Sequence, residues 1–414
     1  MTTTDPAQAT AATDELPPYP WIGHNRECPF DPAPLLGELR GTRPVAPVKM
    51  RQFGNDAWLV TRYEDVCAVL ADRRFSAERK RPNFPHVGPP RSSVPGNFIF
   101  SDPPEHTRLR RLVARNFTAR TAEELRPRIQ RYVDEAVDRM AAAGPPADIK
   151  TELALPLPVQ VGAELVGIPR PDADLFLEVS RAIMSRGATP EETKARLGAA
   201  HRYVAQLAET KQREPGDDLM SRLVAEREAT GDCTREELVG LVMVLMLGSY
   251  ETTSNSISLS VLLLMSQPGV LARVREDASL VGPVVEECLR FTTVTHTGIP
   301  RIAKEDVEVG GQLIRAGEGV VVSNVAANRD EAVFEDPERF DPDRFAGAQP
   351  VQHLAFSYGV HPCIGQSLAR AQMQVVLETL VRRFPGLRLA VPFEEVPFRH
   401  DMYIYGLHKL PVAW

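Results

Sequence analysis

The sequence predicts a mostly α-helical protein with a small β-sheet region. Apolar residues recur with helical periodicity over most of residues 104–384. Strand signals are confined to residues 57–60 and to 301–323, where hairpins are expected to turn at Gly310-Gly311 and near Gly317. Proline, at 36 of 414 residues, is commoner than the usual level of about 5%, but it falls mainly in connections.

Length and composition limit the class of protein. A chain of 414 residues corresponds to two or three domains at about 150 residues each. Its 43% hydrophobic and 25% charged residues are typical of a globular protein and not of a disordered one. The net charge of −7 argues against general binding to nucleic acid or to anionic membranes. Widely spaced cysteines without a C-x-x-C pair favour a reducing compartment; they are Cys28, Cys67, Cys233, Cys288 and Cys363.

Residues 1–20 contain no basic start and no apolar run, so we expect a flexible tail and not a signal peptide or anchor. Elsewhere no apolar run reaches about 18 residues, which predicts a soluble, cytoplasmic protein. Helices are expected at 104–116, 121–143, 151–167, 171–186, 190–213, 217–229, from 234 onward, and at 281–291 and 366–384.

The segment from Thr234 predicts one long buried helix. Thr234 and Glu237 form a capping box, and Gln267-Pro268-Gly269 is a stop signal, giving about 32 residues. Both flanks are apolar on all sides, yet Glu251, Thr252 and Thr253 lie at the centre. Unpartnered buried polar groups cost several kcal/mol. Either these residues form a proton-handling groove, or the hydroxyls bond to carbonyls of the preceding turn and Glu251 pairs with a cation.

A glycine-containing loop, residues 356–365, precedes the last expected helix. Cys363 stands just before that helix, where the dipole and free N–H groups favour a thiolate. A thiolate there would be a nucleophile or a metal ligand. The alternative is a small buried hydrophobic residue.

This loop resembles the heme-binding loop of the cytochrome P450 family in the pattern Phe356, Gly359, His361, Cys363, Gly365. Glu287-Cys288-Leu289-Arg290 is similar to the family's E-x-x-R motif. This spacing places the Glu and the Arg one turn apart on the same helical face, where they can form a buried ion pair. The string 248–253 resembles the family's small-small-x-acid-Thr motif. The resemblance runs from about residue 30 to the end and implies a single heme-thiolate monooxygenase domain over 21–414. Its fold would be a helical prism with the long helix over heme b.

The resemblance implies roles for individual residues. Cys363 would be the iron ligand, and Thr252 and Glu251 would organise water and deliver protons. The propionates would be held by donors that can neutralise a buried dianion: His106, Arg110, Arg301 and His361. Phe356, Gly365 and Gly248 would complete the cofactor site.

A substrate pocket is also carried over from the family. Its residues would be Phe84, Ile99, Val244, Leu247, Gly248, Val294, Thr297, Tyr403 and Ile404. Apolar and hydroxyl-bearing side chains together suit a medium-sized lipophilic molecule with oxygen functions. Ser249 departs from the family's usual residue; its hydroxyl would bond the Leu245 carbonyl or alter water order.

The chain has no nicotinamide, flavin or iron–sulfur motif, so partners must supply electrons. We expect a ferredoxin and its NAD(P)H-dependent reductase, docking on a basic patch of Arg108, Arg111 and Arg115; a solvated charged face is the alternative. The chain ends resemble bacterial members that oxidise secondary metabolites or xenobiotics, and a monomer is expected. Hydroxylation or epoxidation is the expected reaction. Oxidative coupling, a peroxide-driven enzyme and a non-turnover recruitment protein remain alternatives.

Overall fold

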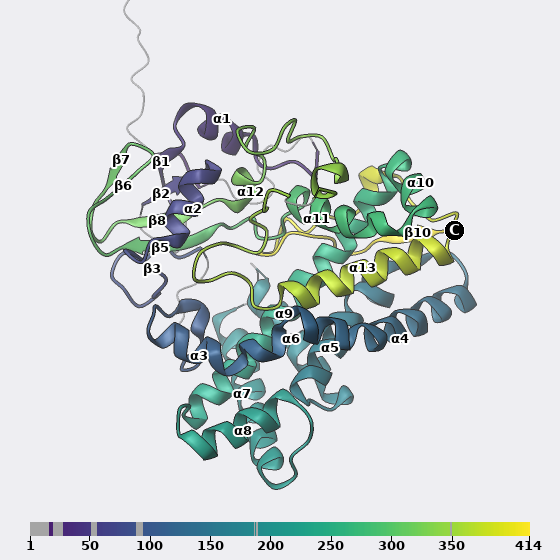
Figure 1. The fold of residues 1–414 in the computed structure, drawn as a ribbon, viewed down its shortest axis with the longest axis horizontal. Coiled ribbons are helices and arrows are strands. Elements are labelled where there is room, and N and C mark those ends of the chain that lie inside the picture. The colour runs from purple at the N-terminus through teal and green to yellow at the C-terminus, as the bar shows by residue number, and fades with distance from the viewer. Residues whose placement is uncertain are drawn as a thin grey trace, which may run out of the picture.

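The computed structural model describes residues 16–19, 28–50, 56–87, 94–185, 187, 189–347 and 350–414. Helices make up most of the molecule, and the largest sheet lies to one side, next to α1 and α2 (Figure 1). This arrangement confirms the predicted fold class. The helices are α1 (Pro34–Thr42), α2 (Tyr63–Ala71), α3 (Glu105–Ala114), α4 (Ala119–Ala143), α5 (Pro156–Val166), α6 (Ala173–Met184), α7 (Pro190–Arg213), α8 (Leu219–Thr230), α9 (Arg235–Met265), α10 (Pro268–Glu276), α11 (Val281–Phe291), α12 (Asn324–Ala327) and α13 (Gln366–Arg383).

The predicted long helices fall close to their expected bounds, and those at 190–213 and 281–291 coincide with α7 and α11. The shorter helices α1, α2, α10 and α12 were not predicted. Each offers too few turns for a clear period, since 3.6 residues complete one turn. Pro268, read as part of a stop signal, is also the first residue of α10, a position that proline favours.

The largest sheet has the strand order β1-β2-β8-β5-β3. It is formed by β1 (Val45–Val48), β2 (Ala57–Val60), β8 (Gly319–Val322), β5 (Ile299–Ala303) and β3 (Phe75–Ser76). A second sheet joins β4 (Ala147–Asp148), β10 (Pro411–Ala413) and β9 (Arg388–Leu389), and β6 (Val307–Val309) pairs with β7 (Gln312–Ile314). The predicted hairpin turn is confirmed at Gly310 and Gly311, which both have positive φ.

Helix α9 is the central element, and most of its residues are buried. Its predicted capping box is confirmed: Thr234 Oγ1 accepts from the Glu237 N–H at 3.1 Å, and the Glu237 carboxylate accepts from the Thr234 N–H at 2.9 Å. Among the described residues no single helix is long and apolar enough to cross a membrane. Only α9 and α10 together pass such a test, across a 100° bend.

Residues 16–19 depart from the flexible tail that was expected for residues 1–20. Residues 1–15 and 20 lie outside the described residues, but residues 16–19 pack on the body of the protein. Tyr19 is 1% exposed, and its N–H donates to the Lys49 carbonyl at 3.0 Å. Burial of the tyrosine ring in the core beside Leu36 and Val48 fixes this segment, so a flexible tail cannot include it.

The segment at residues 94–100 touches the backbone of α9 through two glycines. Gly96 has φ +82°, and a Cβ there would lie 2.1 Å from the Glu237 carbonyl oxygen. A Cβ on Gly240 would lie 1.7 Å from the Pro95 carbonyl oxygen. Only glycine allows this approach, which holds the segment against α9.

We expect Gly240→Ala to destabilise the protein by about 1–3 kcal/mol, because the added methyl overpacks a backbone contact. Gly282→Ala in α11 is the matched control, since a Cβ there meets no heavy atom of the described residues within 4 Å. This control should be neutral or stabilising by up to about 1 kcal/mol. Urea unfolding of both variants measures the difference. Equal stability would contradict the close contact.

Candidate active site

The cysteine loop is closed by its own backbone. The Cys363 N–H donates to the Phe356 carbonyl at 2.8 Å, and the Ser357 N–H donates to the Leu354 carbonyl at 3.0 Å. Gly359 has φ +72°, and a Cβ there would lie 2.0 Å from the carbonyl oxygen of Leu70 in α2. The loop is therefore pressed against α2 and presents Cys363 at the wall of a cavity.

Opposing electrostatic effects act on the thiol of Cys363. Burial raises the pKa of the thiol, and the lowering effects of the Gly365 N–H and of Arg110 and Arg370 do not offset it. A thiolate at Cys363 stays a prediction. A coordinated metal would remove the proton, since metal-bound thiols are deprotonated.

The cavity has a volume of about 370 Å³ and lies between α9, the segment joining α11 to β5, and the cysteine loop. Many of the predicted residues line it: Ile99, Arg110, Val244, Gly248, Thr252, Val294, Thr297, Phe356, His361, Cys363 and Gly365. Ser249, Thr253 and Ser256 of α9 also face it. The loop and α9 thus meet at one site, as predicted.

Four predicted pocket residues are not among the described residues that line this cavity: Phe84, Leu247, Tyr403 and Ile404. Phe84 is buried beside His86, with ring centroids 5.2 Å apart. Leu247 lies off the stripe formed by Val244, Gly248 and Thr252, which are four residues apart on one helical face. Placing these residues required side-chain directions that alignment alone does not supply.

The polar centre of α9 divides between two faces of the helix. Thr252 Oγ1 donates to the Gly248 carbonyl at 2.8 Å, and Ser249 Oγ donates to the Met246 carbonyl at 2.9 Å, not to the expected Leu245. Glu251, 2% exposed, does not line the cavity and forms an ion pair with Arg399. The back-bonded hydroxyls and the cation-paired carboxylate of the structural alternative are therefore present. Proton delivery by Glu251 stays a prediction.

Two arginines and two histidines lie close together beside the cavity: Arg110, Arg301, His106 and His361. His106 is 3% exposed, and neither of its ring nitrogens has a hydrogen-bond partner in the part of the chain that the structure describes. Its ring centroid lies 4.1 Å from that of His361. Burial and the charges of Arg110 and Arg301 lower the pKa of His106 to about 4. The four predicted propionate ligands are thus brought together.

These residues fit a heme group. Unpaired buried ring nitrogens are costly, and a carboxylate would satisfy them. Two arginines and two imidazoles supply the donors that two propionates need. Cys363 lies on the cavity wall, where it would supply the thiolate ligand of the iron.

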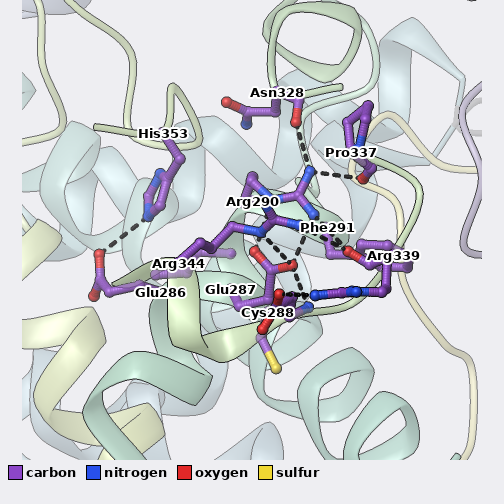
Figure 2. Close-up of polar contacts among 12 residues, drawn as sticks. Glu286, Glu287, Cys288, Arg290, Phe291, Asn328, Pro337, Arg339, Arg344 and His353 are labelled. Carbon is purple, nitrogen blue, oxygen red and sulfur yellow. Dashed lines mark hydrogen bonds and ion pairs between the residues drawn. The ribbon is translucent and has the colours of Figure 1, made fainter. Parts of the chain in front are cut away.

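The E-x-x-R motif forms a buried ion pair, as predicted. The side chains of Glu287 and Arg290 are both 0% exposed and are joined by two hydrogen bonds of 2.7 Å (Figure 2). Arg290 also donates to the carbonyls of Asn328 at 2.8 Å and Pro337 at 2.9 Å. The pair therefore fastens α11 to the segments that precede the cysteine loop.

The three arginines of the expected redox-partner surface lie on α3 or directly after it, and each has an acidic partner. Docking of a ferredoxin on this surface stays a prediction. Arg108 pairs with Glu237, Arg111 with Asp232 at 3.6 Å, and Arg115 with Glu226 at 3.1 Å. These acids lie more than 100 residues further along the chain, so the sequence gives no sign of their proximity.

Sequence reasoning also missed two residues that organise the site. Arg399 pairs with Glu251, and Glu286 binds Arg370 and His353. Glu286 adjoins the E-x-x-R motif, but no spacing rule links it with residues so distant in the chain.

We expect the heme-free protein to lose stability as the pH falls below about 6.5, the ordinary histidine pKa. Burial, Arg301, His106 and Arg110 lower the pKa of His361 to about 2, so the unfolded chain binds more protons than the folded one. Each extra proton adds up to about 1.4 kcal/mol per pH unit. His361→Gln should reduce this slope between pH 7 and 5 in urea unfolding. An unchanged slope would contradict the buried neutral imidazole.

Comparison with known proteins agrees with this site. The family model for cytochrome P450 matches residues 164–392. The chain is 45% identical over 390 residues to cytochrome P450-SU2 of Streptomyces griseolus, covering 94% of each protein. It is 43% identical over 381 residues to mycinamicin IV hydroxylase/epoxidase of Micromonospora griseorubida, covering 91% of this chain and 94% of that protein. The crystal structure of CYP105P1 in complex with filipin I matches with a TM-score of 0.89 and 40% identity, covering 97% of this chain and 99% of that one.

The relatives match nearly the whole chain, and the residues matched by the family model include α9, the E-x-x-R pair and the cysteine loop. The mostly helical fold is the one that the sequence resemblance implied. The protein belongs to the cytochrome P450 family and is a P450 monooxygenase.

Proposed function

We propose that this enzyme inserts one oxygen atom of O2 into a medium-sized lipophilic natural product or xenobiotic, by hydroxylation or epoxidation. The observation that supports this most is the cavity bounded by Cys363 on one side and the Thr252 stripe of α9 on the other. The second oxygen atom leaves as water, with two protons and two electrons supplied. Heme b, when bound, supplies the iron at which O2 is activated.

The protein's own residues hold the cofactor and shape the reaction site. Cys363 is the proposed iron ligand, and His106, Arg110, Arg301 and His361 bind the propionates. The Thr252 hydroxyl lies on the cavity wall, where it orders water and relays protons. Glu251 would have to leave Arg399 before its carboxylate could take part.

The cavity wall supports a substrate with oxygen functions. Ile99, Val244 and Val294 provide apolar surface, while Thr295 and Thr297 add hydroxyl groups. A relative named mycinamicin IV hydroxylase/epoxidase and a structure with bound filipin I agree with such a substrate class.

Electrons are proposed to come from a ferredoxin that is reduced by an NAD(P)H-dependent reductase. Docking is proposed at the α3 face, where the Arg111 side chain is 70% exposed and lies 3.6 Å from Asp232. Arg108 and Arg115 contribute less charge, because they are paired more closely. Cytoplasmic location and a monomeric state stay predictions.

The function is tested by titrating the purified ferric protein with polyketides, terpenoids and other lipophilic compounds. A saturable shift from low spin to high spin identifies a ligand that displaces iron-bound water. That ligand is then incubated with ferredoxin, reductase, NAD(P)H and O2. Oxygenated product is expected; faster turnover with peroxide than with ferredoxin would favour a peroxide-driven enzyme instead.

We expect Cys363→Ser to abolish the thiolate-type spectrum of the reduced carbon monoxide complex, because the sulfur ligand is lost. Cys233→Ser is the control, since Cys233 is buried two residues before α9 and is not among the described residues that line the cavity. Survival of the spectrum in Cys363→Ser would refute the ligand assignment.

We expect Thr252→Ala to uncouple electron use from product formation, because a proton-relaying hydroxyl is lost. Product per NAD(P)H consumed should fall by about tenfold or more. Thr210→Ala is the matched control: its hydroxyl also bonds the carbonyl four residues back, at 3.2 Å, but on α7. Unchanged coupling in Thr252→Ala would exclude this role.

A further inference from the structure

Glu286 stands next to Glu287 of the E-x-x-R pair but binds different partners. Arg370 of α13 donates two hydrogen bonds to the Glu286 carboxylate, from Nε to Oε1 at 2.7 Å and from Nη2 to Oε2 at 2.9 Å. His353 Nε2 lies 3.1 Å from Oε2 (Figure 2). One carboxylate thus joins α11, α13 and the segment leading into the cysteine loop.

The hydrogen bonds of His353 fix its orientation. Its Nδ1 accepts from the Ala355 N–H at 3.2 Å, so Nε2 bears the proton and donates to Glu286. Burial would raise the pKa of Glu286, but the bonds from His353 and Arg370 outweigh it and lower the pKa to about 2. Glu286 is therefore an anion at neutral pH.

Both partners of Glu286 pack on Phe356. The Arg370 guanidinium carbon lies 4.6 Å from the centroid of the Phe356 ring, a cation–π distance. The His353 ring centroid lies 5.9 Å from it. Phe356 lines the cavity, and its carbonyl accepts the Cys363 N–H at 2.8 Å. A continuous set of contacts therefore connects Glu286 with the sulfur ligand.

We propose that Glu286 is a positioning residue for Cys363: it holds Arg370 and His353 against Phe356, whose carbonyl in turn fixes the cysteine backbone. This inference rests on the proposed heme-thiolate function. It is distinct from the Glu287–Arg290 pair, whose contacts run to the segments at residues 328–344. Without the carboxylate, the buried Nε2 of His353 loses its acceptor. Among the described residues the Arg370 side chain then keeps one hydrogen-bond partner, Gln366 at 3.0 Å.

The test compares Glu286→Gln with Glu164→Gln in the full-length, heme-loaded protein. Glu164 is a matched control: its side chain is 28% exposed against 24% for Glu286, and it also has two partners, Arg128 at 2.6 Å and Tyr132 at 2.5 Å. Neither partner belongs to the cysteine loop. The reduced carbon monoxide complex of Glu286→Gln should lose its thiolate-type spectrum about 10- to 100-fold faster than the wild type. Glu164→Gln should match the wild type.

A second measurement does not depend on iron. Amide hydrogen exchange of residues 356–363 in the heme-free protein should be faster in Glu286→Gln than in Glu164→Gln. Arg370→Lys keeps the positive charge but loses the bidentate hydrogen bonding to Glu286. The lifetime of its thiolate-type spectrum should therefore fall between those of Glu286→Gln and the wild type. This variant decides the question if Glu286→Gln does not fold.

The outcomes separate this inference from the proposed function. If the wild type shows the thiolate-type spectrum, and Glu286→Gln and Arg370→Lys match the wild type in both lifetime and exchange, the positioning role is overturned. If the wild type itself lacks that spectrum, the heme-thiolate function fails instead. The exchange comparison then still reports whether Glu286 holds the loop.

Discussion

The buried ion pair between Glu287 and Arg290 is the constraint on which the rest of the site depends. Removing two charges from water is costly, and a buried pair is tolerated only when its remaining donors and acceptors are also satisfied. Here Arg290 donates to backbone carbonyls of distant segments, while Glu287 accepts from the Asp341 N–H at 2.8 Å and from Arg344 at 3.2 Å. These hydrogen bonds fix the position of residues 328–344 relative to α11. Asn328 extends the network, because its side-chain oxygen accepts the N–H of Leu354, two residues before the cysteine loop, at 2.6 Å.

Positive charge is concentrated beside the cavity, although the protein as a whole is acidic. The chain as a whole has a net charge of −7, yet Arg110 and Arg301 converge with two neutral imidazoles beside the cavity. Among the described residues the buried ring nitrogens of His106 have no hydrogen-bond partner, and an anion beside them would offset that cost. Elsewhere Arg108 of α3 pairs with Glu237 of α9, and Arg115, directly after α3, pairs with Glu226 of α8. Their charges therefore contribute less to an open binding surface.

Helix α9 shows how one element serves both packing and chemistry. Its apolar flanks bury the helix, while its central residues divide between two faces by the 3.6-residue period. Val244, Gly248 and Thr252 face the cavity, whereas Glu251 faces Arg399 on the C-terminal segment. A Cβ on Gly406 would lie 2.0 Å from the Asn255 side-chain oxygen, so this segment packs directly on α9.

The sequence by itself determined the features that depend on neighbouring residues. The capping box and end of α9, the hairpin at Gly310-Gly311, the spacing of Glu287 and Arg290 on one helical turn, and the loop around Cys363 all rest on local geometry, which fixed motifs encode. The tertiary structure decided the rest: the partners of Glu251, Glu286 and Arg108, and the side of α9 that faces the cavity. Those contacts join residues tens to more than a hundred positions apart, and only the packed fold determines which charges meet and which side chains reach the site.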